Sequence, residues 1–158
     1  MREAAYLVVV GDGPLRPAVT EAVRRSPAPE RITVTGFVPH SAVPQILASL
    51  DLLALPSVYE EMGSVLVEAM ATGLPVVASR VGGIPDVVED GVTGVLVPAG
   101  DVDALAAALD ELVADPDRRR RLSTAAGERA ARYSWPTLAR RTAELYAGLA
   151  AVEERAQK

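Results

Sequence analysis

The stretch from Asp51 to Ser79 reads DLLALPSVYEEMGSVLVEAMATGLPVVAS and decides the fold. Its first five residues form a short apolar run that Pro56 ends, and its last four residues, VVAS, form a second one. Short apolar runs of this kind are typical of buried strands. Between them, Gly63 to Thr72 predicts a helix that the sequence Gly-Leu-Pro stops. Two strands joined in this way form a right-handed βαβ unit with parallel strands.

The same alternation extends along the rest of the chain. Further strands are predicted at Tyr6–Val10, Ile32–Phe37 and Val95–Val97. Helices are predicted from Pro14 to Pro27, Ser41 to Leu50, Asp101 to Ala114, Asp117 to Arg132 and Trp135 to Glu154, with Asp101 and Asp117 as N-caps. The sequence therefore predicts one Rossmann-like α/β domain over residues 1–158, a parallel sheet with helices on both faces.

Composition narrows the classes of function. The 158 residues include no cysteine and one histidine, so we expect no disulfide and no metal site built from thiolates or histidines. The net charge of −5 argues against a nucleic-acid surface. The basic run Arg118–Arg121 predicts a solvated helix face, and contact with a membrane or an anionic partner is the alternative. No leader or membrane span is recognisable, which favours a cytoplasmic protein, with peripheral membrane association left open.

Glycine gathers where the predicted strands end. In parallel α/β sheets, ligands bind beyond the carboxyl ends of the strands, where glycine permits tight turns and close approach. These ends define a candidate binding face, although loops after strands often need glycine for their own turns. The segments are Gly11–Gly13, Gly36–Val38, Pro56–Gly63, Ser79–Gly83 and Pro98–Gly100.

Two carboxylates flank the predicted start of the central helix. The first turn beginning at Gly63 offers free amides of Ser64 and Val65, which suit an anion such as a diphosphate. Glu68 interrupts an apolar helix, and its carboxylate is costly to bury unless a partner, such as a pair of ribose hydroxyls, donates hydrogen bonds to it. Glu60 lies on the loop before the helix and can fold back over the same cleft. The alternative is that both are ordinary surface charges.

This region resembles the E-x7-E signature of the family 4, or group 1, retaining glycosyltransferases with the GT-B fold. Other segments match that family in the same order and spacing, over about residues 5–150. They are Gly11–Pro14, Gly36–Val38, Asp51–Ser57, Glu68–Pro75, Gly82–Pro85, Asp90–Gly94 and Ser134–Trp135.

The resemblance implies a role for each matching residue. Glu60 would be the catalytic residue that contacts the transferred sugar, and Glu68 would bind the ribose of a UDP- or GDP-linked donor. The reaction implied is transfer of a hexose with retention of configuration, through a front-face route and without a cofactor or a metal. The remaining donor-binding residues implied are Gly63, Ser64 and Val65 at the diphosphate, Phe37 and Val38 at the base, and Gly11 and Gly13 in the first loop.

Two parts of the family pattern have no match. The N-terminal acceptor domain is one, and the first strand of the donor domain, with its Gly-Arg-Leu and Lys-Gly segments, is the other. That strand lies between those at Leu7 and Leu52, so we expect either a gap or direct pairing there. An unpaired edge favours self-association. We also expect little activity without a partner chain that supplies the other half, and a final helix, residues 135–158, that crosses to that half.

Other residues have weaker patterns. His40 is a candidate base, although an exposed loop position is favoured, and Arg80 is expected in a surface salt bridge. Gly82-Gly83 is expected to begin the next helix, and Trp135 and Tyr146 are expected to pack. A non-catalytic nucleotide-sugar-binding module is the alternative function, and a dinucleotide enzyme is disfavoured because Pro14 breaks the glycine fingerprint. The base, the sugar and the acceptor are not specified.

Overall fold

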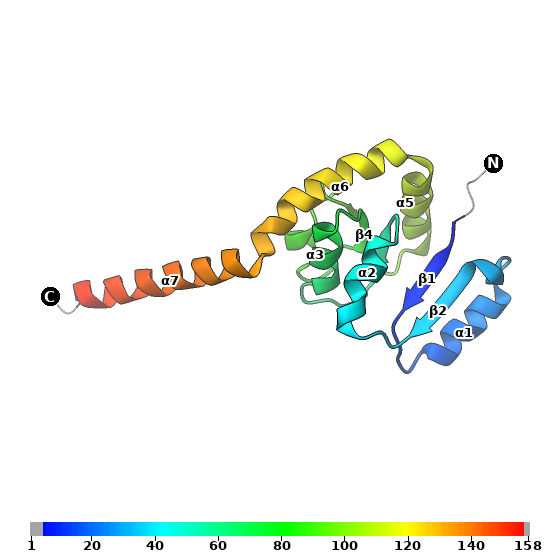
Figure 1. The fold of residues 1–158 in the computed structure, drawn as a ribbon, viewed down its shortest axis with the longest axis horizontal. Helices are drawn as coiled ribbons and strands as arrows, with labels where there is room; N and C mark the ends of the chain where they lie inside the picture. The colour runs from blue at the N-terminus through cyan, green and yellow to red at the C-terminus, as the bar shows by residue number, and fades with distance from the viewer. Residues whose placement is uncertain (1–4, 157–158) are drawn as a thin grey trace.

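The computed structural model describes residues 5–156, and its strands and helices alternate along the chain as predicted (Figure 1). The strands are β1 Leu7–Val10, β2 Ile32–Gly36, β3 Leu53–Leu55, β4 Val76–Ser79 and β5 Val95–Val97. The helices are α1 Arg16–Arg25, α2 Val43–Ala48, α3 Ser64–Ala71, α4 Ile84–Val87, α5 Val102–Ala114, α6 Pro116–Ala130 and α7 Trp135–Ala156, with 3-10 turns η1 Pro29–Arg31, η2 His40–Ala42 and η3 Ala131–Tyr133. Residues 1–4 and 157–158 of the predicted domain, including the end of its predicted crossing helix, lie outside the described residues.

The βαβ unit predicted from the central stretch forms the middle of the molecule. Strands β3, β4 and β5 are parallel and pair in that order, with Leu53 opposite Val76 and Ser79 opposite Val97. All four residues of β4 are buried, as expected for a central strand covered on both faces.

The two faces of this sheet carry separate hydrophobic clusters. Side chains alternate along β4, so Val76 and Ala78 pack with α2, α3 and α4 while Val77 packs with α5. Helix α6 serves both clusters, with Leu122 in the second and Ala126 in the first. The prediction of a parallel sheet flanked by helices is confirmed.

Strands β1 and β2 form a separate two-stranded parallel sheet, so the predicted single sheet is divided in two. No strand pairing joins β1 to β3 among residues 5–156, and of the two expected arrangements the structure therefore shows the gap. In Figure 1, β1, β2 and α1 form one end of the body, away from the end where α7 leaves. The physical reason is that nothing in the described chain supplies the strand that would connect the two edges.

Helix α5 begins as predicted, but α6 does not. The Asp101 carboxylate accepts a hydrogen bond from the Ala104 amide at 2.9 Å and caps α5. Helix α6 begins at Pro116 and is capped by Asp115, whose carboxylate accepts from the Arg118 amide at 2.8 Å. The prediction that Asp117 is the cap is therefore wrong. Proline favours the first helical position, and this places the cap one residue before Pro116.

Helix α7 extends from the body as a single rod (Figure 1). Trp135 and Tyr146 were expected to pack, but they are 85% and 68% exposed, so the prediction is wrong for the described residues of this chain. Leu145 and Leu149 are exposed on the same helix, so these apolar side chains have little cover from the part of the chain that the structure describes. In the part of the chain that the structure describes, no helix combines the length and apolarity that a membrane span requires.

Candidate functional site

The loop of residues 56–63, called here the Glu60 loop, connects β3 to α3 at the carboxyl end of the sheet. Gly63 ends the loop in a left-handed conformation, with φ of 75°, which favours glycine. A Cβ there would lie 2.9 Å from Cδ1 of Leu66, so glycine also permits the close packing of this turn. Helix α3 begins immediately, with the Leu66 amide donating to the Gly63 carbonyl at 2.8 Å. Ser64 is exposed and Val65 half-buried in this first turn.

Glu60 folds back onto the start of this helix. Its Oε1 accepts a hydrogen bond from the Gly63 amide at 3.1 Å. The carboxylate therefore lies at the positive end of α3, in the region where an anion would be held. A phosphate group placed at the Ser64 and Val65 amides would repel this carboxylate and favour its rotation toward whatever the phosphate carries.

Glu68 lies on the exposed side of α3. Leu66, Ala69 and Met70 are buried, while Glu68 is half-buried on another face of the helix. Among residues 5–156, its carboxylate has no hydrogen-bond or ion-pair partner. The expectation of a largely buried helix around Glu68 is confirmed, since Val65 and Val67 also pack against the core, but Glu68 itself lies on the more open face that carries Ser64 and Ala71.

An open pocket of about 360 Å³ lies beside Glu68, between α3 and the end of α6. The α6 side of this pocket consists of small residues, which leaves room for a ligand or a side chain next to the carboxylate. The lining residues are Val67, Glu68, Ala71, Gly127, Ala130, Ala131, Tyr133 and Ser134.

Gly82 and Gly83 precede α4 as expected, and they also lie against the Glu60 loop. A Cβ on Gly82 would lie 1.7 Å from the Glu60 carbonyl oxygen, and one on Gly83 would lie 2.2 Å from that of Glu61. The Gly83 amide donates to the Glu61 carbonyl at 2.9 Å. The backbone of the loop therefore lies directly against this glycine pair, which also precedes α4.

The loops after β1 and β2 are held together by Arg16. Its Nη1 lies 2.5 Å from Oδ2 of Asp12 and would be 2.7 Å from a Cβ on Gly36. The hydrogen bond from the Gly13 amide, and then the one from Arg16, lower the pKa of the Asp12 carboxyl below its usual 3.8. The Gly11 amide donates to the Gly36 carbonyl at 3.0 Å. The amides of Gly11 and Gly13 are thus already used within the chain.

The remaining predicted residues lie on the surface of this region. The Phe37 side chain follows β2 and is 80% exposed, and Val38 is half-buried. His40 is exposed at the start of η2, which confirms the predicted exposed position. Arg80 forms an ion pair with Asp90, which confirms the predicted salt bridge.

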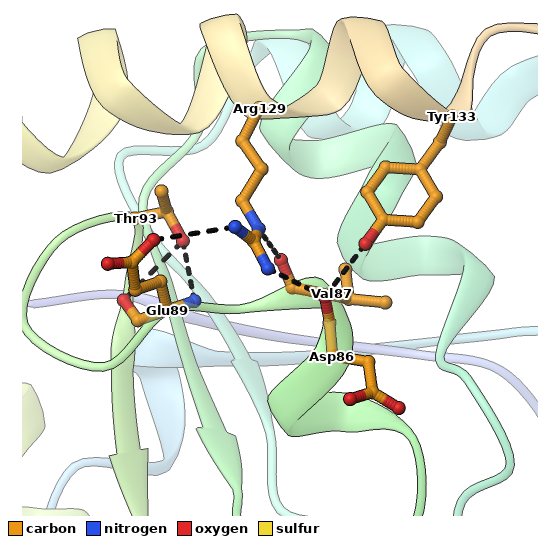
Figure 2. A network of polar contacts seen from close by, with 6 residues as sticks. All are labelled: Asp86, Val87, Glu89, Thr93, Arg129 and Tyr133. Atoms are coloured by element: carbon orange, nitrogen blue, oxygen red, sulfur yellow. Dashed lines mark hydrogen bonds and ion pairs between the residues drawn. The ribbon is translucent and has the colours of Figure 1, made fainter. Parts of the chain in front are cut away.

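Arg129 and Tyr133 were not found from the sequence. Figure 2 shows both side chains reaching from α6 and η3 to the end of α4. Arg129 donates to the carbonyls of Val87 and Asp86 at 2.6 and 2.7 Å, and the Tyr133 hydroxyl donates to Asp86 at 2.8 Å. These are contacts across more than 40 positions of sequence, and neither helical periodicity nor spacing indicates them.

The family profile described as "Glycosyl transferases group 1" matches residues 1–129. The chain belongs to this family. A 2-deoxystreptamine N-acetyl-D-glucosaminyltransferase of Streptomyces fradiae is 44% identical over 122 residues, and an alpha-D-kanosaminyltransferase of Streptomyces kanamyceticus is 37% identical over 140 residues. The matched regions are 77% and 88% of this chain, but only 29% and 36% of those relatives. The chain thus spans well under half the length of these relatives.

Solved structures show the same fold. Anabaena HepE, solved in complex with UDP-glucose, superimposes with a TM-score of 0.82 at 30% identity, over 90% of this chain and 41% of that one. A sucrose-phosphate synthase of Thermosynechococcus elongatus gives a TM-score of 0.81 at 34% identity, over 92% of this chain and 39% of that one. The predicted C-terminal domain of a GT-B group 1 glycosyltransferase is confirmed.

Proposed function

We propose that this domain binds the donor of a retaining glycosyltransferase, a UDP- or GDP-linked sugar. The observation that carries the proposal is the start of α3, where free first-turn amides lie beside the Glu60 carboxylate at the carboxyl ends of the strands. The relative HepE was solved with UDP-glucose, which supports a donor of this class.

Each residue has a defined part in the proposed site. The amides of Ser64 and Val65 hold the diphosphate at the positive end of α3. The unpartnered Glu68 carboxylate accepts hydrogen bonds from the two ribose hydroxyls, which satisfy both of its oxygens. The nucleoside is bordered from the other sheet by Phe37, Val38, Gly11 and Gly13. The two glycines make van der Waals contact only, because their amides are already hydrogen-bonded within the chain.

Glu60 is the proposed catalytic residue. Breaking the bond between the anomeric carbon and the diphosphate develops positive charge on the sugar, and a nearby carboxylate stabilises that charge. The donor diphosphate displaces Glu60 from the Gly63 amide by repulsion and turns it toward the sugar. The acceptor oxygen then bonds to the anomeric carbon on the face that the diphosphate leaves, and the diphosphate takes the acceptor proton, so configuration is retained. We propose that no metal takes part.

Calorimetric titration of the chain with UDP, UDP-sugars and GDP-sugars in EDTA tests the proposal. We expect saturable binding of one nucleotide sugar, its loss in Glu68→Ala, and no binding of NADH. A chain that binds none of these nucleotides would refute the proposal. Turnover only after addition of the remaining part of a group 1 enzyme would separate a catalytic half from a binding module.

The unpaired edges of β1 and β3 carry a second part of the proposal. Exposed backbone donors and acceptors at a strand edge pair readily with another chain. We therefore expect self-association of this chain through the gap, measured as concentration-dependent sedimentation. A monomer at every concentration tested would contradict it.

A further inference from the structure

We propose that Arg129 is a positioning residue for the Glu60 loop. It lies on α6, outside the predicted donor site, and it acts through α4 and the Gly82-Gly83 turn on the backbone of Glu60. This inference rests on the proposed function, because the position of Glu60 affects a donor only if Glu60 faces the transferred sugar.

Arg129 holds the end of α4 with an unusually complete set of contacts. Its side chain is only 19% exposed, its Nε and Nη2 donate to two successive carbonyls, and its Nη1 lies 3.4 Å from Oε2 of Glu89 (Figure 2). Buried Thr93 accepts from the Glu89 amide at 2.8 Å and holds that residue in the turn after α4. The planar guanidinium matches paired acceptors that a lysine ammonium cannot span.

Helix α4 depends on these contacts because it is very short. It has four residues, and the one hydrogen bond that closes a full turn runs from the Val88 amide to the Ile84 carbonyl at 2.8 Å. The last carbonyls of any helix lack partners within it. Arg129 and Tyr133 supply those partners at Asp86 and Val87. Without Arg129, the Val87 carbonyl loses its donor in a partly buried setting, which favours a shift of α4.

A shift of α4 reaches the Glu60 loop without any flexible segment between them. Gly83 is the N-cap of α4, and its amide is the donor to the Glu61 carbonyl at 2.9 Å. Gly82 lies so close to the Glu60 carbonyl that even one added methyl group would collide with it. The contacts therefore form an unbroken series from α6 to the residue that we propose to be catalytic.

The chain contains a matched control on the same helix. Arg119 Nη1 donates to the carbonyls of Leu112 and Val113 at 2.5 and 2.8 Å and closes the end of α5. Arg119 donates hydrogen bonds to the end of a helix as Arg129 does. That helix is α5, which the Gly82-Gly83 pair does not connect to the Glu60 loop. Glu89→Gln is a second control, since it removes only the ion pair, whose carboxylate is 57% exposed.

Amide NMR spectra of the 158-residue chain test the structural step without any ligand. In Arg129→Gln we expect the signals of Glu61, Gly63 and Gly83 to shift, and in Arg119→Gln and Glu89→Gln we expect them to stay. Arg129→Lys should shift them as Arg129→Gln does, because charge alone does not replace two parallel hydrogen bonds. Unmoved signals in Arg129→Gln, or equal shifts in Arg119→Gln, overturn the inference.

Titration with UDP and with the UDP- or GDP-sugar that wild type binds then tests the functional step. A misplaced Glu60 should weaken binding of the nucleotide sugar about tenfold, the equivalent of one charged hydrogen bond, and leave the free nucleoside diphosphate within about twofold. Arg119→Gln should bind both as wild type does. Equal weakening of both ligands in Arg129→Gln overturns the inference, whereas a wild type that binds neither refutes the proposed function and leaves the NMR result as the test of Arg129.

Discussion

Replacing Gly82 by alanine places a methyl group 1.7 Å from the Glu60 carbonyl oxygen, where ordinary contact begins at 3.4 Å. One of the two backbones must therefore retreat by about 1.7 Å, and either movement displaces the Glu60 loop relative to the glycine pair. A displacement of this size removes a side chain from hydrogen-bond range. We expect Gly82→Ala to weaken binding of the nucleotide sugar at least tenfold, by loss of about 1.5–3 kcal/mol for one charged hydrogen bond.

The substitution also strains the backbone, and this effect needs a control. Gly82 has φ of 50°, and a side chain in that region costs about 1–2 kcal/mol. Gly91 has φ of 74° with nothing within 4 Å of an added Cβ, so Gly91→Ala imposes the strain without the collision. For both variants, urea denaturation gives the free energy of unfolding and calorimetry gives the affinity for the nucleotide sugar. Wild-type affinity in Gly82→Ala, or the same loss of affinity in Gly91→Ala, would refute the reasoning.

Three further predictions concern single carboxylates. Glu68→Gln should weaken binding of UDP about tenfold. It should change the free energy of unfolding by less than about 0.5 kcal/mol, because the half-exposed carboxylate has no partner among the described residues. A large loss of stability in urea would contradict this. Asp101→Ala should lower the free energy of unfolding by about 1 kcal/mol through loss of the α5 cap, with UDP binding unchanged as the check. The pKa of Asp12 is lowered in the folded chain, so its carboxylate stabilises the fold above pH 3.8. That stabilisation is lost as the pH falls through the lower pKa of the folded chain. An NMR titration midpoint at or above 3.8 would contradict this.

The sequence predicted the alternation of elements and the glycine turn that begins α3, because both follow from short-range patterns. The apolar run Val76–Ser79 indicated a strand covered on both faces, and all of it is buried. Gly63 indicated the turn into α3, and it has the left-handed conformation that glycine permits. These features depend on neighbouring residues, so one sequence is sufficient to predict them.

What the sequence did not predict depends on contacts between distant segments. Nothing near Arg129 indicates that its guanidinium reaches the carbonyls of Asp86 and Val87, which lie more than 40 positions earlier. The apolar neighbours of Glu68 indicated a buried helix, and Val65 and Val67 do pack against the core, but Glu68 lies beside an open pocket and is only half-buried. Patterns of apolar residues do not show which face of a helix has no neighbour.

The gap between β1 and β3 divides the domain into two parts that differ in local stability. Helix α1 has no buried residue and β1 has none either, whereas β4 is buried throughout. Segments with so little buried surface open locally long before the core unfolds, and amide hydrogen exchange should be faster in residues 7–36 than in β4. Gly11, Gly13 and Phe37 lie on or next to this weakly held part, and Ser64 and Glu68 lie on the firm one. If a donor contacts both parts, some of its binding free energy is offset by the ordering of residues 7–36. A strand that fills the gap would order these residues in advance and raise the affinity for the donor without contacting it.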